Sequence, residues 1–180
     1  MDALIITGQE FEDSEVLYPK YRLEEAGFGV DVVTPDGKNV AGKHGIECPA
    51  DGAIGEYGTD VVDDYDLLVV PGGRAPESIR TASPTAAAIV AAFDKADKPI
   101  CSICHGVQLL ISADILQGRT LTGYQALAVD IKNAGGTFKD ERVVIDDNLV
   151  TSRIPDDLPA LMRETLGVVE GVDVPAVGAD

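Results

Sequence analysis

Short runs of apolar residues alternate with segments of helical spacing along this chain. The clearest runs are residues 3–7, 66–70 and 99–103, and they show little of the apolar–polar alternation of a strand with one face in water. Such strands are typical of a parallel sheet that helices cover on both faces. We therefore expect an α/β fold in which ligands bind beyond the carboxyl ends of the strands.

The same patterning predicts a single domain over residues 1–167, followed by an acidic and partly disordered tail over residues 168–180. Further strands are expected at residues 30–34, 119–122, 142–145 and 149–152. Helices are expected from Pro76 onward and at residues 85–96, 107–113, 127–134 and 158–166.

Two segments are harder to assign from the pattern. The first helix is expected to start at Asp13 or Ser14, but Pro19 favours a late start or a kink. Residues 35–58 are rich in Gly and Asp and are expected to form a loop with a small hairpin around residues 43–45.

The composition is strongly acidic, with 31 Asp and Glu residues against 14 Lys and Arg residues and a formal net charge of -17. Nucleic acids and anionic membranes require clustered cations, so this balance argues against both as partners. The chain has no apolar run of the roughly 20 residues that a membrane span needs, and it opens without the basic region of a signal peptide. We therefore expect a soluble, cytoplasmic protein.

Residues 102–106, Ser-Ile-Cys-His-Gly, lie between a predicted buried strand and a predicted helix. Small residues two positions before and two positions after a nucleophile are typical of a nucleophile elbow, a sharp turn that projects its central side chain above the sheet. The nearby helix N-terminus is expected to favour the thiolate over the thiol. Cys104 is therefore the candidate nucleophile.

Other interpretations of this segment compete with the elbow. The first alternative is that Cys104 is a buried structural thiol without a catalytic role. Cys101, Cys104 and His105 also match the C-x-x-C-H pattern of haem attachment and the C-x-x-C pattern of redox pairs. Both are disfavoured because Cys101 belongs to the predicted strand and no distal haem ligand is evident. Three cysteines and two histidines give no convincing zinc site, so no metal is expected.

The segment Pro71-Gly72-Gly73 ends the neighbouring predicted strand. Glycines allow a close approach of the backbone, so N–H groups here are candidates for an oxyanion hole that faces Cys104. Carboxylates follow these strand ends, and one of them can meet the cysteine, although composition does not choose among them. The candidates are Glu10, Glu12, Glu15 and Glu77.

Four segments occur in an order that resembles a known family. They are residues 10–13 (Glu-Phe-Glu-Asp), 42–45 (Gly-Lys-His-Gly), 71–77 (Pro-Gly-Gly-Arg-Ala-Pro-Glu) and 102–106. Together they resemble the ThiJ/PfpI superfamily, and the match is closest to the PfpI-type intracellular proteases, over nearly the whole predicted domain. The resemblance implies a flavodoxin-like three-layer α/β/α sandwich that is related to the class I glutamine amidotransferases.

The resemblance also implies how the site is built. Cys104 is the nucleophile with His105 beside it, and Glu77 comes from a neighbouring subunit to orient the histidine. This arrangement implies a homo-oligomer, commonly dimers that assemble into hexamers. Glu12 lies against the cysteine sulfur and tunes its ionisation, and its carboxyl is expected to stay protonated because two adjacent negative charges are costly.

Gly73 and the backbone of His105 supply the oxyanion hole in this resemblance. Tyr124 matches a tyrosine near the pocket, and His44 matches a motif histidine. Cys101 departs from the family pattern, because relatives usually carry a small apolar residue there. It is either a small core thiol or the partner that resolves an oxidised Cys104 as a disulfide.

Members of the resembled family are assigned as peptidases, cofactor-independent glyoxalases, protein deglycases and chaperones. The enzymes share the addition of a thiolate to a carbonyl, with the oxyanion held by backbone N–H groups. We therefore expect Cys104 to attack a small electrophilic carbonyl, such as methylglyoxal or its protein adducts, without a cofactor. The alternatives are peptide hydrolysis inside an oligomeric chamber and a redox-sensing stress chaperone.

The acidic residues are spread along the chain and are not gathered in one segment. Such a surface repels itself at low ionic strength, and counterions relieve that repulsion. We therefore predict adaptation to a salt-rich cytoplasm, with a thermal midpoint that rises from low to molar KCl. Greater stability at low salt would contradict this prediction and leave the charge as an aid to solubility alone.

Overall fold

The computed structural model of the chain describes residues 1–169. Its centre is a sheet with the strand order β10-β11-β7-β6-β1-β2-β5, in which neighbours are parallel except for β10 and β11. Its strands are β1 (Asp2–Ile6), β2 (Gly29–Thr34), β5 (Gly52–Ala53), β6 (Leu67–Val70), β7 (Ile100–Ile103), β10 (Val143–Asp146) and β11 (Leu149–Ser152). Two small sheets pair β3 (Val40–Ala41) with β4 (Glu47–Cys48) and β8 (Thr120–Leu121) with β9 (Thr137–Phe138).

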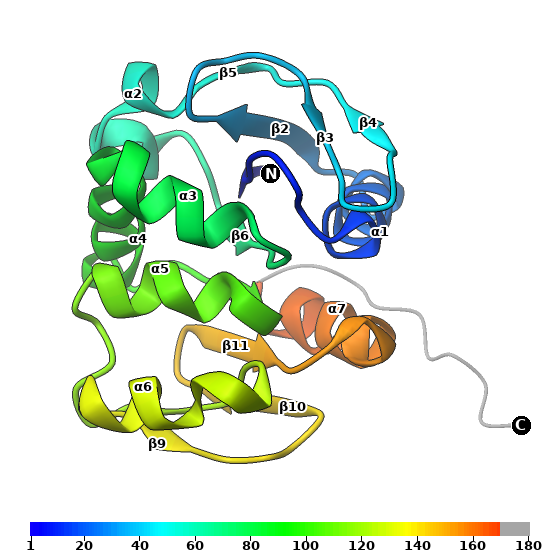
Figure 1. Cartoon of the computed structure of the whole chain (residues 1–180). Helices are drawn as coiled ribbons and strands as arrows, with labels where there is room; N and C mark the ends of the chain where they lie inside the picture. Colours follow the sequence, from blue (N-terminus) through cyan, green and yellow to red (C-terminus); the bar gives the residue numbers. More distant parts are fainter. Residues whose placement is uncertain (170–180) are drawn as a thin grey trace, which may run out of the picture.

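Helices cover both faces of the central sheet (Figure 1). The α-helices are α1 (Asp13–Glu25), α2 (Ile54–Tyr57), α3 (Ala75–Ala82), α4 (Pro84–Lys95), α5 (Val107–Ser112), α6 (Ala128–Asn133) and α7 (Leu158–Val168). Helices α1 and α7 contact each other on one face, and α3, α4 and α5 contact one another on the other. This arrangement confirms the predicted flavodoxin-like α/β/α sandwich. Within residues 1–169, no helix has both the length and the apolarity of a membrane span.

The central strands form the core because both of their faces are covered. Leu4, Ile5, Leu68 and Val69 have no exposed surface. Fully burying an aliphatic side chain of this size contributes roughly 1.5–3 kcal/mol. This packing fixes the parallel register of β1, β6 and β7, so that their carboxyl ends lie at one edge of the sheet.

Helix α1 begins at Asp13 and runs through Pro19, so the expectation of a late start was wrong. Pro19 is buried together with Val16 and Leu23. Their burial offsets the hydrogen bond that a proline nitrogen cannot donate inside a helix. Because the helix starts at Asp13, Glu15 falls in its first turn and is buried at the edge of the sheet.

The segment predicted as a loop over residues 35–58 contains the predicted hairpin, formed by β3 and β4. It also contains β5 and α2, which the sequence pattern did not predict because such short elements leave no periodic signal. At the other end of the chain, α7 reaches Val168. The predicted acidic tail, residues 168–180, therefore begins at the end of α7. Its residues from 170 onward lie outside the described residues.

Between β7 and α5 the chain turns sharply at Cys104, whose φ of 59° lies in the left-handed region. One short 3-10 turn, Cys104–Gly106, joins the two elements. A Cβ atom on Gly106 would lie 2.1 Å from the carbonyl oxygen of Val70 in β6, so this close approach requires glycine. The backbone thus has the predicted elbow geometry and presents Cys104 beyond the ends of the central strands.

Candidate active site

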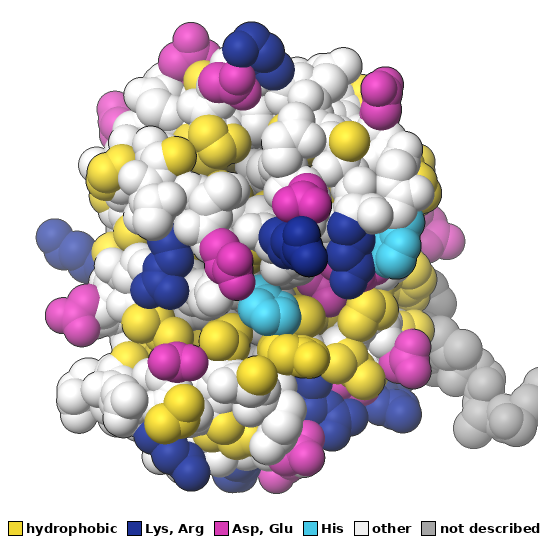
Figure 2. All heavy atoms as spheres, viewed as in Figure 1, with side chains coloured by type: hydrophobic (Ala, Val, Ile, Leu, Met, Phe, Trp, Pro, Cys, Tyr) yellow, Lys and Arg dark blue, Asp and Glu magenta, His cyan; other side chains and the backbone are white. Residues whose placement is uncertain are grey.

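A cavity of about 550 Å³ opens at the carboxyl ends of β1, β6 and β7, and it brings all the predicted site residues together. Its lining consists of Glu10, Glu12, Glu15, Lys43, His44, Gly73, Arg74, Glu77, Cys104, His105, Tyr124, Ile154 and Pro155. Figure 2 shows this face, with one histidine below and one beside a pair of cationic side chains and with hydrophobic side chains beneath them. The cavity therefore has one polar wall and one largely apolar wall.

The nucleophile candidate sits in a tightly built corner of this cavity. Cys104 is 8% exposed, and its Sγ lies 3.3 Å from Nδ1 of His105. The backbone N–H groups of His105 and Gly73 face the sulfur. Gly73 has a φ of 77°, and a Cβ atom there would lie 2.2 Å from the backbone nitrogen of Glu12. The two N–H groups thus lie where an oxyanion hole is needed, and that role stays a prediction.

The surroundings of Cys104 favour the neutral thiol over the thiolate. Burial, and secondly the neighbouring carboxyl of Glu15, raise the pKa of the Cys104 thiol to about 12 against the opposing effect of the two N–H groups. The prediction that a helix N-terminus favours the thiolate was therefore wrong. Helix α5 is short and starts only at Val107, and burial outweighs any dipole it supplies. Attack on a substrate consequently requires a group that takes up the thiol proton.

His105 is suited to accept that proton because its imidazole is neutral near pH 7. Burial lowers the pKa of His105 below its ordinary value of 6.5, whereas the negative charge of Glu77 acts in the opposite direction. The imidazole stacks on the ring of Tyr124, with a centroid distance of 4.6 Å and an interplanar angle of 26°. Glu77 is exposed at the cavity rim, and within residues 1–169 no hydrogen bond joins it to His105.

Glu15 occupies the place that the resemblance implied for Glu12. Its carboxyl is fully buried, accepts a hydrogen bond of 2.8 Å from the N–H of Gly72 and interacts with the Cys104 thiol. Burial raises the pKa of Glu15 to about 7. The contact expected of Glu12 was therefore wrong, because residue 12 precedes α1 whereas residue 15 is turned inward in its first turn. The sequence signal was present, since Glu15 was one of the candidate carboxylates.

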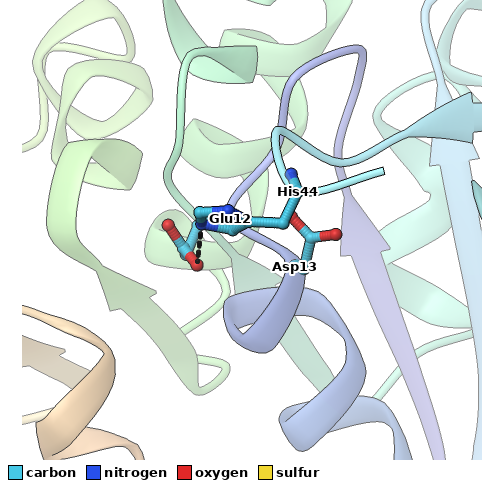
Figure 3. Close-up of side chains that lie close together, drawn as sticks. All are labelled: Glu12, Asp13 and His44. Carbon is cyan, nitrogen blue, oxygen red and sulfur yellow. Dashed lines mark hydrogen bonds and ion pairs between the residues drawn. The ribbon is translucent and has the colours of Figure 1, made fainter. Parts of the chain in front are cut away.

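Glu12 lies instead at the mouth of the cavity. It forms an ion pair of 2.5 Å with Nζ of Lys43 and lies 3.6 Å from Nε2 of His44 (Figure 3). The hydrogen bond to Glu12 raises the pKa of Lys43, which therefore stays protonated. Lys43 and His44 both belong to the loop between β3 and β4, so Glu12 links this hairpin to the start of α1.

Asp13, which the sequence analysis did not single out as a site residue, holds the same hairpin loop. Its two carboxylate oxygens accept hydrogen bonds from the backbone N–H groups of His44, at 2.9 Å, and Ile46, at 3.0 Å. Burial by itself would raise the pKa of Asp13, but these N–H groups lower it. A Cβ atom on Gly42 would lie 2.4 Å from this carboxyl, so a glycine lets the loop close over Asp13.

Glu12, Asp13 and His44 present three ligand atoms that lie within 4.8 Å of one another. Figure 3 shows the imidazole of His44 turned toward Glu12, with the Asp13 carboxylate on the other side of it. Both oxygens of Asp13 are engaged by backbone N–H groups, and the ammonium of Lys43 is bound to Glu12, where it would repel a cation. We therefore interpret the three residues as a clamp for the hairpin and not as a metal centre.

Cys101 lies on β7 with no exposed surface, and its thiol interacts with Thr165 of α7. Burial raises the pKa of Cys101 to about 12. Cys48, Cys101 and Cys104 are all free thiols. A resolving cysteine must reach the oxidised sulfur as a thiolate, so this burial beneath α7 favours the core-thiol interpretation of Cys101.

Comparison with known proteins identifies the wider group. A family model described as the DJ-1/PfpI family matches residues 1–167. The chain belongs to the DJ-1/PfpI family. Among its relatives in this family is the deglycase PfpI of Pyrococcus furiosus, 42% identical over 164 residues that cover 91% of this chain and 96% of the relative. Another is "Putative cysteine protease YraA" of Bacillus subtilis, 41% identical over 169 residues that cover 93% and 97% of the two chains.

Solved structures show the same DJ-1/PfpI fold. The match to a two-domain protein from Anabaena variabilis with DJ-1/ThiJ/PfpI-like and ferritin-like domains has a TM-score of 0.90 and 33% identity. It covers 100% of this chain and 53% of that protein, so the chain spans about half of the larger molecule. The match to DJ-1 of Schizosaccharomyces pombe has a TM-score of 0.86 at 21% identity and covers 95% and 93% of the two chains.

The buried carboxyl of Glu15 predicts a pH-dependent stability. Its folded-state pKa of about 7 exceeds the ordinary 4.5, so its contribution to folding is complete below about pH 4.5 and is lost as the pH rises through about 7. Relative to Glu15→Gln, wild type should lose on the order of 3 kcal/mol of unfolding free energy over this range.

Urea unfolding of both proteins from about pH 5 to pH 8 measures this difference, and the same pair in a Cys104→Ala background removes the titration of the thiol. A difference between the two proteins that stays constant with pH would show that Glu15 is not held in its protonated form.

Proposed function

We propose that this protein is a cysteine-dependent enzyme in which Cys104 adds to small electrophilic carbonyls, as a deglycase or a glyoxalase. One observation carries the proposal: a buried thiol lies 3.3 Å from a neutral imidazole, in a cavity where two backbone N–H groups converge on the sulfur. The relative named deglycase PfpI supports the carbonyl chemistry. The cavity of about 550 Å³ is of the size that ligand sites usually have.

The geometry supports the following sequence with methylglyoxal. Nδ1 of His105 takes the thiol proton while Sγ bonds to the aldehyde carbon, and the N–H groups of Gly73 and His105 hold the oxygen as it becomes negative. His105 gives the thiol proton to that oxygen, which forms a hemithioacetal, and the neutral imidazole then removes the proton from the same carbon. The proton of the carbon passes to the neighbouring carbonyl carbon and the hydroxyl proton to its oxygen, which leaves a lactoyl thioester on Cys104. Water hydrolyses the thioester, so that methylglyoxal and one water yield lactate and the free thiol, with no cofactor.

Peptide hydrolysis is the second candidate. The relative named YraA carries a cysteine protease name, and an amide carbonyl needs the same nucleophile and the same oxyanion donors. A cavity with one polar and one largely apolar wall also offers more room than a three-carbon substrate requires. The two candidates differ in the leaving group, because peptide cleavage expels an amine that His105 must protonate.

We further propose that the active form is a dimer or a hexamer in which Glu77 of one copy orients His105 of another. Within the described residues of one chain, Glu77 forms no hydrogen bond with His105. Its negative charge nevertheless opposes the lowering of the His105 pKa by burial. Mixing Cys104→Ala subunits with Glu77→Gln subunits should then restore part of the lost activity, because some mixed sites regain both groups. Sedimentation should show a dimer or hexamer, and a monomeric mass without complementation would contradict the proposal.

The activity itself is tested by methylglyoxal consumption and lactate formation in molar KCl. Cys104→Ala should reduce turnover by on the order of a thousandfold or more, because the variant lacks the thiol that forms the covalent bond to the substrate in the proposed reaction. Cys101→Ala is the matched control and should keep most of the turnover, because Cys101 is buried beneath α7.

Equal turnover by wild type and Cys104→Ala would remove the glyoxalase function. Cleavage of small peptides that disappears with Cys104 would then identify a peptidase. If neither reaction depends on Cys104 and Cys104→Ala still suppresses protein aggregation, the chaperone alternative holds.

A further inference from the structure

Tyr124 contacts the catalytic candidates in two separate ways. Its ring stacks on the imidazole of His105, with centroids 4.6 Å apart and planes inclined by 26°. Its backbone N–H donates a hydrogen bond of 3.1 Å to the carbonyl oxygen of Cys104. The preceding Gly123 favours this approach, since a Cβ atom there would lie 3.3 Å from the same carbonyl oxygen, a tight contact. One residue thus touches both the nucleophile's backbone and the ring of the base.

The imidazole of His105 has few other constraints. Within residues 1–169, its side-chain hydrogen bonding is limited to the contact between Nδ1 and Sγ of Cys104. Glu77 and Lys43 influence its ionisation through their charges, but neither forms a hydrogen bond with it. In nucleophile–base pairs the base is usually oriented by a third group, commonly a carboxylate. Here an aromatic ring lies on the face of the imidazole and restrains it in addition to the hydrogen bond proposed for Glu77 of another copy.

Stacking controls the one degree of freedom that proton transfer depends on. Rotation of the imidazole about its bond to Cβ swings Nδ1 away from the sulfur, and a general base must stay within hydrogen-bond reach of the proton it takes. A ring stacked at 26° restricts the plane of the imidazole through contact between the two aromatic faces.

We propose that Tyr124 is a positioning residue whose aromatic ring holds the imidazole of His105 with Nδ1 toward Sγ of Cys104. The proposal rests on the proposed function only in taking Cys104 and His105 as the reacting pair. The ring is the essential part, because the backbone hydrogen bond from residue 124 to Cys104 survives a change of side chain. The hydroxyl of Tyr124 takes no part in the stack.

The test compares Tyr124→Leu, which keeps apolar bulk without an aromatic face, with Tyr124→Phe, which keeps the ring. The first measurement is the rate of Cys104 alkylation by iodoacetamide from about pH 6 to pH 9, which reports thiol activation without any natural substrate. Tyr124→Leu should react roughly three- to tenfold more slowly near pH 7, the range that the loss of one aromatic contact allows. Tyr124→Phe should recover the rate to within about twofold of wild type.

The second measurement is the nitrogen-15 NMR spectrum of histidine-labelled protein, which contains only two imidazoles. His44→Gln assigns the remaining signals to His105. Wild type and Tyr124→Phe should show one fixed tautomer of His105, and Tyr124→Leu should show averaging between tautomers. A role of Tyr124 in folding alone would move the thermal midpoint but not these signals.

Three outcomes would overturn the proposal. An alkylation profile and a His105 spectrum unchanged in Tyr124→Leu would make Tyr124 a wall of the cavity only. Equal losses in Tyr124→Phe and Tyr124→Leu would assign the effect to the hydroxyl. Loss of the alkylation rate with an unchanged tautomer would assign it to access of the reagent. Failure of methylglyoxal turnover leaves all these measurements intact, so the proposed function and this inference fail separately.

Discussion

The site depends on three backbone segments that pack against one another where β1, β6 and β7 end. A side chain on Gly106 would strike the carbonyl oxygen of Val70, and one on Gly72 would lie 2.8 Å from the backbone nitrogen of His105. One on Gly73 would strike the backbone nitrogen of Glu12. Glycines at these positions let main chains meet directly. This contact brings N–H groups to the sulfur, bends the elbow and sets the first turn of α1 beside it.

The close packing of the segments also decides the electrostatics. Burial in the inner corner of the cavity disfavours charge, so the pKa values of Cys104 and Glu15 are raised and that of His105 is lowered there. In a chain with a formal charge of -17, the charged residues stay at the rim, where Lys43 neutralises Glu12 and Arg74 neutralises Glu10. In the proposed function, catalysis therefore begins with proton transfer from the Cys104 thiol to the His105 imidazole, because a standing thiolate is costly.

Much of this arrangement could be predicted from the sequence because it is local. The apolar runs predict the central strands, and the pattern around Cys104 predicts the elbow, since both depend on neighbouring residues only. The choice between Glu12 and Glu15 could not be made this way. It depends on the residue at which α1 begins, and Pro19 gave a misleading signal there, because burial of its ring compensates for its missing N–H group.

The direction of the cysteine pKa was missed for a related reason. A helix N-terminus is visible in a sequence, whereas the degree of burial at the end of a sheet is a property of the assembled layers. Asp13 was overlooked as a site residue because its partners are backbone N–H groups 31 and 33 residues away, which carry no side-chain signature. The stacking of Tyr124 on His105 likewise joins two segments that only the fold brings together.

Asp13 helps to fix the course of the hairpin loop, whereas the side chains of that loop set the chemistry of the cavity wall. Asp13 holds the hairpin loop through main-chain N–H groups, and no side chain of that loop takes part in the two hydrogen bonds. When the side chains at positions 43 and 44 change, these two backbone hydrogen bonds can stay, whereas the contacts of Lys43 and His44 with Glu12 are lost. Substitutions at these two positions therefore change which molecules enter the cavity, and loss of the Lys43 charge also shifts the ionisation of His105 and Glu15 beneath them.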